Sequence, residues 1–415
     1  MLLAGDFAYK IKKPLNLGFL DYSTLELRRR FCEEEVRLNR RMCSDAYLGT
    51  IPVTRGPAGG YRFGGEGEPV EWAVQMRRLP ADRAMPALLA RGEVDFEMTR
   101  AIAHRLAEFH LSAETNDYIA SFGAVDAVMV NWRENFEQTA PYIGRTITRE
   151  QWERIRAYVE SFVEGDRPLF ERRVAEGRSS DCHGDLRAQA IVFRDGDVWI
   201  YDCIEFNDRI RYGDVASDIA FLAMDLDFRG RPDLADDLLG LYLNVTQDAT
   251  LPLVLNFYRC YRAYVRGKVD GFQIDQSEVG ARQRAAAGRR AQRYFRLAEA
   301  YASQRTLRAL IIVSGLSGVG KSFIAYALAS RLGALVISSD VTRKRLAGVP
   351  PTEAHLEPWG QGIYGAELTE RTYAAMLDEA DARLAEGRAV ALDATFLRRS
   401  HRDAARELAK RRRAR

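Results

Sequence analysis

The segment ALIIVSGLSGVGKSFIAYALASRL, residues 309–332, decides the expected fold of the last quarter of the chain. It begins with an apolar run of the buried-strand type, and a helical pattern follows over Ser322–Leu332. Two more apolar runs come later, ALVISSD at 334–340 and AVALDATF at 389–396, with a helical pattern at 368–386 between them. Because strands that alternate with helices form parallel sheets, this region is expected to be α/β with a parallel sheet.

A glycine-rich loop joins the first of these strands to its helix. Residues 315–322 read GLSGVGKS and match GxxxxGK[ST] at every fixed position, which disfavours a turn that only links strand to helix. Glycines let backbone N–H groups turn inward around phosphate oxygens, and the helix N-terminus adds a favourable dipole. The loop is therefore predicted to bind ATP, with Lys321 on the β and γ phosphates and the Ser322 hydroxyl on Mg²⁺. The nucleotide-binding residues predicted here are Gly315, Ser317, Gly318, Val319, Gly320, Lys321 and Ser322.

Charged residues after the next two strands extend the predicted site. Asp340 is placed at the end of the second strand, where a carboxylate can hold an acceptor hydroxyl or its proton, with Arg343 one turn away for anionic groups. An N-cap that opens a helix is the open alternative for Asp340. Asp393 ends the third strand, which predicts a carboxylate beside the Mg²⁺ position.

Through GLSGVGKS, SSDVTRK and LDATF, the segment from Ala309 to about Arg406 resembles the small P-loop kinases and zeta-toxin-like ATPases. The resemblance implies transfer of the γ-phosphate of ATP to a small hydroxyl acceptor. Those kinases continue for further strands and carry an arginine-bearing lid, whereas this chain stops at KRRRAR. Residues 308–415 are therefore expected to form an incomplete P-loop domain.

The first third of the chain has a strand-rich pattern. FAYKIKK (7–13) alternates, residues 26–42 have a helical pattern, and residues 53–76 give strand, glycine-rich turn and strand. After Pro80 helical patterns prevail, including residues 97–113. A small β lobe is thus expected to precede a helical lobe.

Two features complete the expected organisation. The runs AIVF (190–193) and VWIYD (198–202) flank an Asp-Gly turn and predict a hairpin inside the helical lobe. Residues 274–307 are rich in Arg, Ala and Gln, which predicts a long basic helix between domains. The predicted division is a kinase-like domain at 1–273 (β lobe 1–79, helical lobe 80–273), the linking helix at 274–307 and the P-loop domain at 308–415.

The sequence Cys182-His-Gly-Asp-Leu186 precedes that hairpin, and the hairpin ends in Asp202. A catalytic loop followed by strand, turn, strand and aspartate is the order found in protein kinase-like enzymes. Together with YKIKKPLNLGFLDYSTLELRR, VQMRRLP, EFH and IYDCIEFN, these residues make positions 1 to about 270 resemble the aminoglycoside phosphotransferase family, especially the bacterial version fused to a P-loop kinase domain. The fold implied is α+β and protein kinase-like.

This second resemblance assigns roles to individual residues. It implies that Asp185 is the catalytic base, that Asp202 binds the metal, and that Lys10 binds phosphate while paired with one of Glu33, Glu34 or Glu35. It also implies that residues 76–79 form the hinge that meets adenine. The alternatives are that Lys10 and Lys12 are plain surface lysines and that the glutamate run is a solvated helix face.

Two departures from the family pattern bear on catalysis. The pattern HGDxxxxN places an asparagine in the metal site, but the matching position is Ala190, whose methyl group cannot ligate Mg²⁺. The chain also begins just before the lysine strand, so the glycine-rich strand pair over the phosphates is missing, and the glycines at 56–67 fit a hairpin turn instead.

Composition limits the class of protein. Hydrophobic residues make up 47% and charged residues 29% of the chain, which describes an ordinary globular protein. The N-terminus lacks the core of a signal peptide, no apolar run reaches the roughly 20 residues that cross a bilayer, and five scattered cysteines fit a reducing compartment. A cytoplasmic, bacterial protein without a membrane segment is expected.

The charge balance bears on partners. The net charge of +3 gives no global attraction for nucleic acid, and the basic stretches at 282–296 and 410–415 fit solvated surfaces. The leading hypothesis is an ATP- and Mg²⁺-dependent kinase that phosphorylates a hydroxyl of an unidentified small molecule. A catalytically degenerate nucleotide-binding regulator and a kinase acting on polynucleotide ends are the alternatives, and the oligomeric state is left open.

Overall fold

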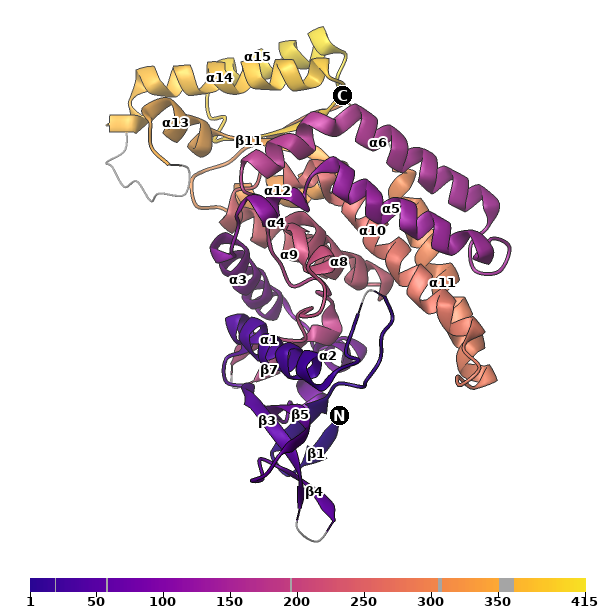
Figure 1. Cartoon of the computed structure of the whole chain (residues 1–415). Coiled ribbons are helices and arrows are strands. Elements are labelled where there is room, and N and C mark those ends of the chain that lie inside the picture. Colours follow the sequence, from indigo (N-terminus) through magenta and orange to yellow (C-terminus); the bar gives the residue numbers. More distant parts are fainter. Residues whose placement is uncertain (19, 57–58, 195, 305–307, 351–361) are drawn as a thin grey trace. The chain divides into compact units, whose positions relative to one another are not determined.

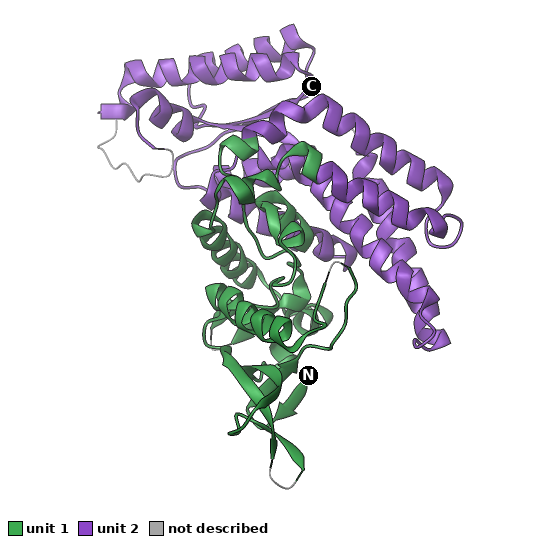
Figure 2. Cartoon of the chain, viewed as in Figure 1, with its two compact units in different colours: residues 1–127, 173–222 green, residues 128–172, 223–415 purple. Residues whose placement is uncertain are grey.

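The computed structural model describes residues 1–18, 20–56, 59–194, 196–304, 308–350 and 362–415. The chain divides into two compact units, one made of residues 1–127 and 173–222 and the other of residues 128–172 and 223–415 (Figure 2). These units do not coincide with the predicted segments, because the second unit joins several helices of the middle of the chain to the C-terminal region. The predicted domain division remains a prediction, and each unit is described by itself.

Unit 1 begins with an antiparallel sheet and one long helix. The strands are β1 (Leu2–Ala4), β2 (Phe7–Ile11), β3 (Tyr47–Gly56), β4 (Gly60–Phe63) and β5 (Pro69–Arg77), in the order β1-β2-β5-β3-β4. Figure 1 labels β1, β3, β4 and β5. Between β2 and β3 lies α1 (Leu25–Cys43), whose first turn is capped by the Thr24 hydroxyl accepting from Leu27 N. Cys32 and Val36 of α1 pack with Val74 and Met76 of β5, so α1 is held firmly against the sheet.

The rest of unit 1 is a set of short elements around two small antiparallel pairs. The hairpin strands β7 and β8 pair with each other, and β6 pairs with β9. The elements are η1 (Ala81–Arg83), α2 (Met85–Arg91), α3 (Phe96–Ser112), α4 (Asp117–Ser121), β6 (Ser179–Asp181), η3 (Ala188–Ala190), β7 (Ile191–Arg194), β8 (Asp197–Ile200), α7 (Asp208–Arg211), β9 (Tyr212–Asp214) and the first part of α8 (Val215–Phe228). The predicted helices at 26–42 and 97–113 and the predicted hairpin are confirmed, while the turn residues 57–58 and 195 lie outside the described residues.

The helices of unit 2 pack around an aromatic core. They are α5 (Val125–Thr139), α6 (Arg149–Ala175), α9 (Pro232–Thr246), α10 (Leu251–Phe272) and α11 (Ala281–Ala302), with η4 (Gln273–Asp275) between the last two. Trp132 stacks on Phe136 and meets Phe257 and Tyr264 edge to face, and aromatic pairs of this kind add to the energy of burial. Ring contacts therefore tie α5 to α10.

The predicted linking helix is present as α11, and it packs along α10. Its apolar face is buried at Ala287, Ala291, Phe295 and Ala298. A side chain at Gly267 of α10 would come within 2.9 Å of the Phe295 ring, so glycine permits this close approach. Residues 305–307, which also fall in the predicted linking segment, lie outside the described residues.

A three-stranded parallel sheet forms the remainder of unit 2. Its strands are β10 (Leu310–Val313), β11 (Ala334–Ser338) and β12 (Ala389–Asp393) in the order β10-β12-β11, with α12 (Lys321–Leu332), α13 (Ser339–Ala347), η5 (Gly362–Tyr364), α14 (Ala366–Ala385) and α15 (Arg399–Arg412) between or after them. Leu335, Ile337, Val390 and Leu392 pack with α14 and α15, shown in yellow in Figure 1. Since strand side chains alternate, Asp393 faces the side of α12.

Helix α12 also rests on α9. The nearest approach is at Gly240, where an added Cβ would lie 2.8 Å from the ring of Phe323. Tyr326 Oη donates to Gln247 Oε1 at 3.0 Å, and Arg331 forms an ion pair with Asp236. The sheet region and the helices of unit 2 thus share a close interface.

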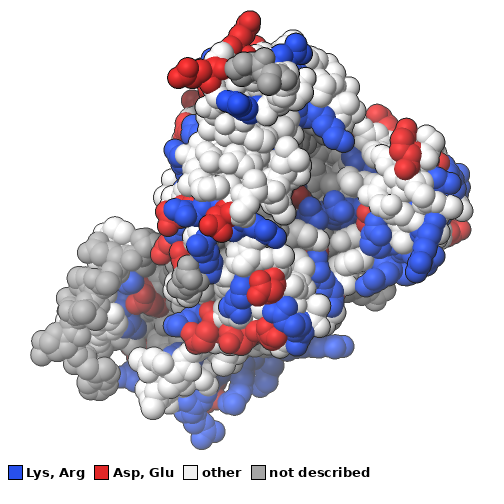
Figure 3. All heavy atoms as spheres, turned by 90° about the horizontal axis from the view of Figure 1, so that it is seen from below, with Lys and Arg blue, Asp and Glu red and all other residues white. Residues whose placement is uncertain are grey.

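The fold class predicted from the sequence is confirmed. Unit 1 has the strand order, the helix between the second and third strands and the later hairpin of a protein kinase-like domain, and residues 308–415 have the parallel sheet and loop of a P-loop domain. Among the described residues, none of the helices combines the length and the apolar character needed to cross a bilayer. On the face drawn in Figure 3, blue basic and red acidic side chains are intermixed.

Candidate functional site

A buried ion-pair network connects β2, α1 and the segment after β8 in unit 1. Lys10 Nζ lies 2.8 Å from Glu35 Oε1 and 2.8 Å from Asp202 Oδ1. Of the three glutamates that the sequence left open, Glu35 is the partner, with a side chain that is 0% exposed. Glu33 pairs with Arg29 and Glu34 with Arg37. The interpretation of Lys10 as a plain surface lysine is therefore wrong.

A second lysine, which sequence reasoning did not assign to the site, completes the network. Lys12 Nζ lies 2.7 Å from Glu35 Oε2 and also pairs with Glu205, and its side chain is only 2% exposed. Tyr22 Oη donates to the same oxygen of Glu205. The available signal was the strand period of two: Lys12 lies two positions after Lys10, directly beyond the end of β2 at Ile11.

The network also controls the charge state of Lys10. Burial by itself lowers the pKa of an ammonium group, but the negative charges of Glu35, Asp202 and Glu205 hold the pKa of Lys10 well above its ordinary value. Burial likewise raises the pKa of Asp202, and Lys10 outweighs it, so that the pKa of Asp202 is lowered. Both groups are therefore charged at neutral pH.

The backbone at Asp202 is unusual. Its φ is +66°, in the left-handed region that non-glycine residues seldom occupy, and its side chain is 58% exposed. Such a conformation costs about 1–3 kcal/mol and persists where the surroundings enforce it. Here it aims one carboxylate toward both Lys10 and the solvent.

The loop around the HGD sequence is fixed by a buried aspartate. Asp218 Oδ1 accepts from Gly184 N at 2.9 Å, and its Oδ2 accepts from His183 N. The next residue, Asp185, forms a bidentate pair with Arg187, with Nε–Oδ1 2.9 Å and Nη2–Oδ2 2.7 Å. Sequence reasoning did not state the role of Asp218 in supporting this loop, and it missed Arg187 as the partner of the predicted base.

His183 is buried in its neutral form. Its Nε2 lies 2.9 Å from Tyr201 O and so donates to it, while Nδ1 accepts from Asp185 N at 3.3 Å. A second proton on Nδ1 would face an N–H donor. Burial lowers the pKa of His183, and the negative charge of Asp218 only partly offsets this.

This histidine predicts a pH dependence of stability. Below about pH 6.5 the unfolded chain binds a proton at residue 183 and the folded unit does not, so stability is lost as the pH falls from about 6.5 toward the lowered pKa of the folded state. His183→Gln should remove up to about 1.4 kcal/mol per pH unit of this slope. Urea unfolding between pH 4.5 and 7.5 measures it.

The matched control is His104→Gln, because His104 is exposed on α3 of the same unit. That variant should keep the wild-type slope. Equal slopes for the wild type and His183→Gln would contradict the neutral, hydrogen-bonded assignment of this imidazole.

A cavity of about 320 Å³ opens between the ion-pair network and the HGD loop. Lys10, Asp185 and Asp202 all line it, so the structure brings together the three residues that the kinase-like resemblance assigned to phosphate, base and metal. Asp202 offers the exposed carboxylate oxygen that a hard divalent cation prefers. Ala190 is buried at the end of η3, and its methyl group offers no ligand.

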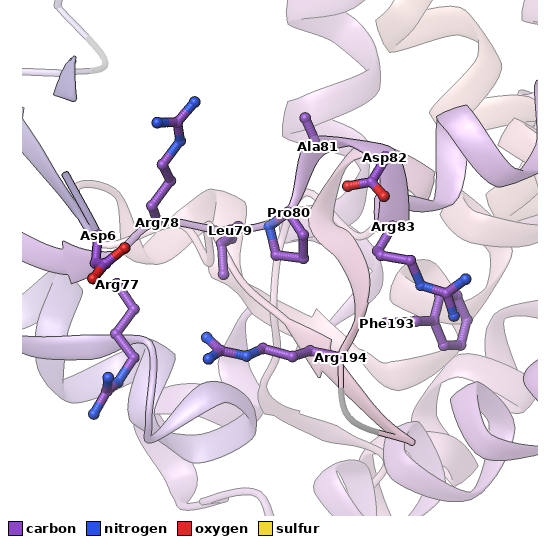
Figure 4. Close-up of a pocket in the computed structure, with 10 residues that line it drawn as sticks. All are labelled: Asp6, Arg77, Arg78, Leu79, Pro80, Ala81, Asp82, Arg83, Phe193 and Arg194. Atoms are coloured by element: carbon purple, nitrogen blue, oxygen red, sulfur yellow. The ribbon is translucent and has the colours of Figure 1, made fainter. Parts of the chain in front are cut away.

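The predicted hinge, residues 76–79, leads into a separate open hollow of about 990 Å³ (Figure 4). Leu79 lines it from the hinge, Pro80 lines it from the next position, and Phe193 lines it from β7. Figure 4 shows four guanidinium groups around this segment, those of Arg77, Arg78, Arg83 and Arg194. Asp6 and Asp82 line the same hollow, so basic side chains outnumber acidic ones there, and the contact of the hinge with adenine stays a prediction.

In unit 2 the phosphate loop has the conformation that its glycines allow. Gly318 has φ +80° and Gly320 has φ +86°, both in the left-handed region that favours glycine, and α12 begins directly after Gly320. Lys321 Nζ donates to Leu316 O at 2.7 Å, across the loop. Ser317 and Val319 lie on the same exposed turn, so the loop is open to a ligand.

The two residues predicted to bind Mg²⁺ in this unit meet. Ser322 Oγ donates to Asp393 Oδ2 at 2.7 Å, although 71 positions separate them. Burial raises the pKa of Asp393, against the opposing effects of Ser322 and Lys321. A hydroxyl and a carboxylate side by side at the start of α12 fit the oxygen-rich first shell of a hard cation.

Asp340 does not end a strand, and it is not an N-cap. β11 ends at Ser338, which is the N-cap residue, so Asp340 lies in the first turn of α13, where its carboxylate pairs with Lys344 at 2.8 Å. The guanidinium of Arg343 stacks over the Tyr364 ring at 4.9 Å. The strand is two residues shorter than expected because α13 begins at Ser339; the Ser338 side chain makes no capping hydrogen bond and interacts with Asp393 instead. The proposed roles of Asp340 and Arg343 remain predictions.

Sequence comparisons give one family model and several relatives. Residues 310–415 match the model of a family described as an AAA domain. The uncharacterized protein Rv2004c of Mycobacterium tuberculosis (strain ATCC 25618 / H37Rv) is 36% identical over 409 residues, which are 99% of this chain and 79% of that protein. The uncharacterized protein Mb2027c of Mycobacterium bovis (strain ATCC BAA-935 / AF2122/97) matches with the same values.

Solved structures show more distant likenesses. A choline kinase from Cryptosporidium parvum Iowa II has a TM-score of 0.41 with 10% identity, covering 70% of this chain and 81% of its own. A glucosamine kinase in complex with glucosamine, ADP and inorganic phosphate has a TM-score of 0.33 with 16% identity, covering 58% and 61%. Both likenesses are partial, and the fold assignment rests on the strand order and ion pairs described above.

Proposed function

This chain belongs to the family of the mycobacterial proteins Rv2004c, MT2060 and Mb2027c, and we propose that it is a kinase that uses Mg²⁺-ATP to phosphorylate a hydroxyl group of a small molecule. Its kinase-like and P-loop folds support a phosphotransferase or nucleotide-binding function. The observation that carries the proposal is the Ser322–Asp393 pair at the start of α12, beside an open phosphate loop. Lys10, Glu35 and Asp202 give parallel support in unit 1.

In the proposed reaction the bond between the γ-phosphorus and the β–γ bridging oxygen breaks, and the acceptor oxygen forms a new bond to that phosphorus. The products are ADP and a phosphate monoester. In unit 1, Asp185 would take the acceptor proton and Lys10 would bind a phosphate oxygen. In unit 2, Lys321 would bind the β and γ phosphates, Ser322 and Asp393 would hold the cation, and Asp340 would take the proton.

Magnesium supplies charge neutralisation of the triphosphate when it is bound. The oxygen donors of Ser322 and Asp393, and of Asp202 in unit 1, fit that cation. Arg343 lies three residues after Asp340, on the same face of α13, and we propose that it contacts an anionic group of the acceptor. The guanidinium has a fork geometry suited to such a group.

An acceptor screen separates the two proposed catalytic sites. We expect transfer of labelled phosphate from ATP to one member of a library of hydroxyl compounds, and a loss of about 10²-fold or more in Asp185→Asn if unit 1 is responsible or in Asp340→Asn if the P-loop domain is. Product formation is followed by thin-layer chromatography of the labelled mixture.

Two aspartates outside the proposed sites provide controls, Asp117, which is exposed, and Asp403, which is partly exposed. Asp117→Asn in unit 1 and Asp403→Asn in unit 2 change the same atoms at the surface and should leave the rate within about twofold. Saturable ATP binding without transfer to any compound would instead favour the nucleotide-binding regulator, an alternative that Ala190 supports.

A further inference from the structure

The charged groups around the unit 1 cavity are almost all paired. Asp202, Asp185 and Glu205 line the cavity, and their partners are Lys10, Arg187 and Lys12 respectively. Glu35 lies behind them and holds both lysines. Lys13 also lines the cavity, so the four carboxylates are balanced by four cations among these described side chains. That balance suits one divalent cation beside a triphosphate better than two.

The side chains available to bind a cation also favour a single cation. The side chain of Glu205 is only 6% exposed. The Asp185 carboxylate accepts hydrogen bonds from the Arg187 guanidinium at both of its oxygens. Asp202 is 58% exposed, and Lys10 contacts only its Oδ1. Ala190 has only a methyl side chain, which cannot bind a metal ion. Among the described residues lining this cavity, Asp202 is thus the carboxylate placed to bind a metal from solution, and the pattern of a two-cation site does not fit.

The guanidinium of Arg187 is well placed to supply the missing positive charge. It follows the predicted base by two residues, it is 15% exposed, and it holds Asp185 through two parallel hydrogen bonds. The same fork geometry matches two oxygens of a phosphate group. The guanidinium also lies over the Phe221 ring at 5.6 Å, which limits the directions in which it can turn.

We propose that unit 1 works with a single divalent cation held by Asp202, and that Arg187 is a catalytic residue that binds the γ-phosphate in place of a second cation. The proposal rests on the phosphotransferase function proposed above. On nucleotide binding the guanidinium moves from Asp185 to the γ-phosphate oxygens. The freed carboxylate then accepts the proton of the acceptor hydroxyl while the phosphoryl group passes from the β–γ bridging oxygen of ATP to the acceptor oxygen.

The test needs no knowledge of the acceptor. The 415-residue chain with Lys321→Ala, in which the P-loop site is silenced, is dialysed to equilibrium against Mn²⁺ with either the non-hydrolysable analogue AMP-PNP or ADP. The ratio of protein-bound Mn²⁺ to protein-bound nucleotide counts the cations, and the two dissociation constants report on contacts with the γ-phosphate. Arg187→Met and Arg187→Lys are compared in the same background, with Arg55→Met on the exposed side of β3 as the control.

We expect about one Mn²⁺ per nucleotide and an affinity for AMP-PNP at least about tenfold above that for ADP, because a charge-assisted pair forms with the γ-phosphate. Arg187→Met should keep the metal ratio and lose the tenfold preference, Arg187→Lys should keep part of the preference, and Arg55→Met should keep all of it. Two Mn²⁺ per nucleotide, or an undiminished preference in Arg187→Met, would overturn the inference alone. Absence of any bound nucleotide would overturn the proposed function of unit 1 as well.

Discussion

Lys321→Ala should weaken ATP binding at the phosphate loop of residues 315–322 by at least about 100-fold. The ammonium group already lies over the loop, 2.7 Å from Leu316 O, and is the one side-chain charge that the loop offers to the β and γ phosphates. Removing one member of a close charge pair costs about 2–5 kcal/mol, partly because the phosphate oxygens then lack a partner. Isothermal titration calorimetry with Mg²⁺-ATP measures the loss.

The control for this variant is Lys410→Ala. Lys410 lies on α15 of the same unit, 73% exposed, where it pairs with Glu407. Exposed pairs of this kind contribute about 0–1 kcal/mol, so ATP affinity and folding should both stay near wild type. Because unit 1 is proposed to bind ATP too, the calorimetric trace should lose one binding event and keep the other. Undiminished affinity at both sites would refute the assignment of this loop.

The second large effect is expected from Glu35→Gln. The Glu35 side chain is 0% exposed and lies 2.8 Å from Lys10 and 2.7 Å from Lys12. The neutral amide keeps the size of the side chain but leaves two ammonium groups short of negative charge, one of them on a side chain only 2% exposed. Breaking a buried ion pair on one side destabilises by about 3–5 kcal/mol. Denaturant unfolding followed by circular dichroism measures this change in free energy.

The glutamate two residues earlier gives a strict comparison. Glu33 belongs to the same run, is 53% exposed and pairs with Arg29 one turn away. Glu33→Gln should change the free energy of unfolding by at most about 0.5 kcal/mol. If the two variants unfold at the same denaturant concentration, the network around Glu35 does not stabilise unit 1 as described.

Sequence reasoning located the strand, loop and helix of residues 309–332 correctly because one short motif contains the pattern. The phosphate loop is contiguous, so roles could be predicted for its glycines, Lys321 and Ser322 together, and these roles stay predictions. Asp393 lies 71 positions beyond Ser322 and was still found, because the carboxyl end of a parallel strand next to the loop strand reaches the same edge of the sheet. The kinase-like order was found for a similar reason, since the HGD loop and Asp202 bracket one hairpin.

The remaining features depend on side-chain directions that a motif does not encode. Three consecutive glutamates on a helix point about 100° apart, so only packing shows that the third one is buried. The role of Arg187 could not be predicted from a motif, because its two hydrogen bonds to Asp185 depend on the side-chain conformation that arginine adopts. Asp340 was misplaced because the residues SSD directly follow an apolar run and suggest its continuation, whereas the helix α13 begins at Ser339.

The contact between α9 and α12 limits how the chain can be divided. A fragment that began near residue 308 would keep the nucleotide loop but lose Gln247 as partner of Tyr326, Asp236 as partner of Arg331, and the glycine surface against which Phe323 rests. Aromatic rings exposed to solvent in this fragment would make it prone to self-association. Shortening the protein for crystallisation or for expression trials should therefore retain residues 232–304 along with the loop that follows them.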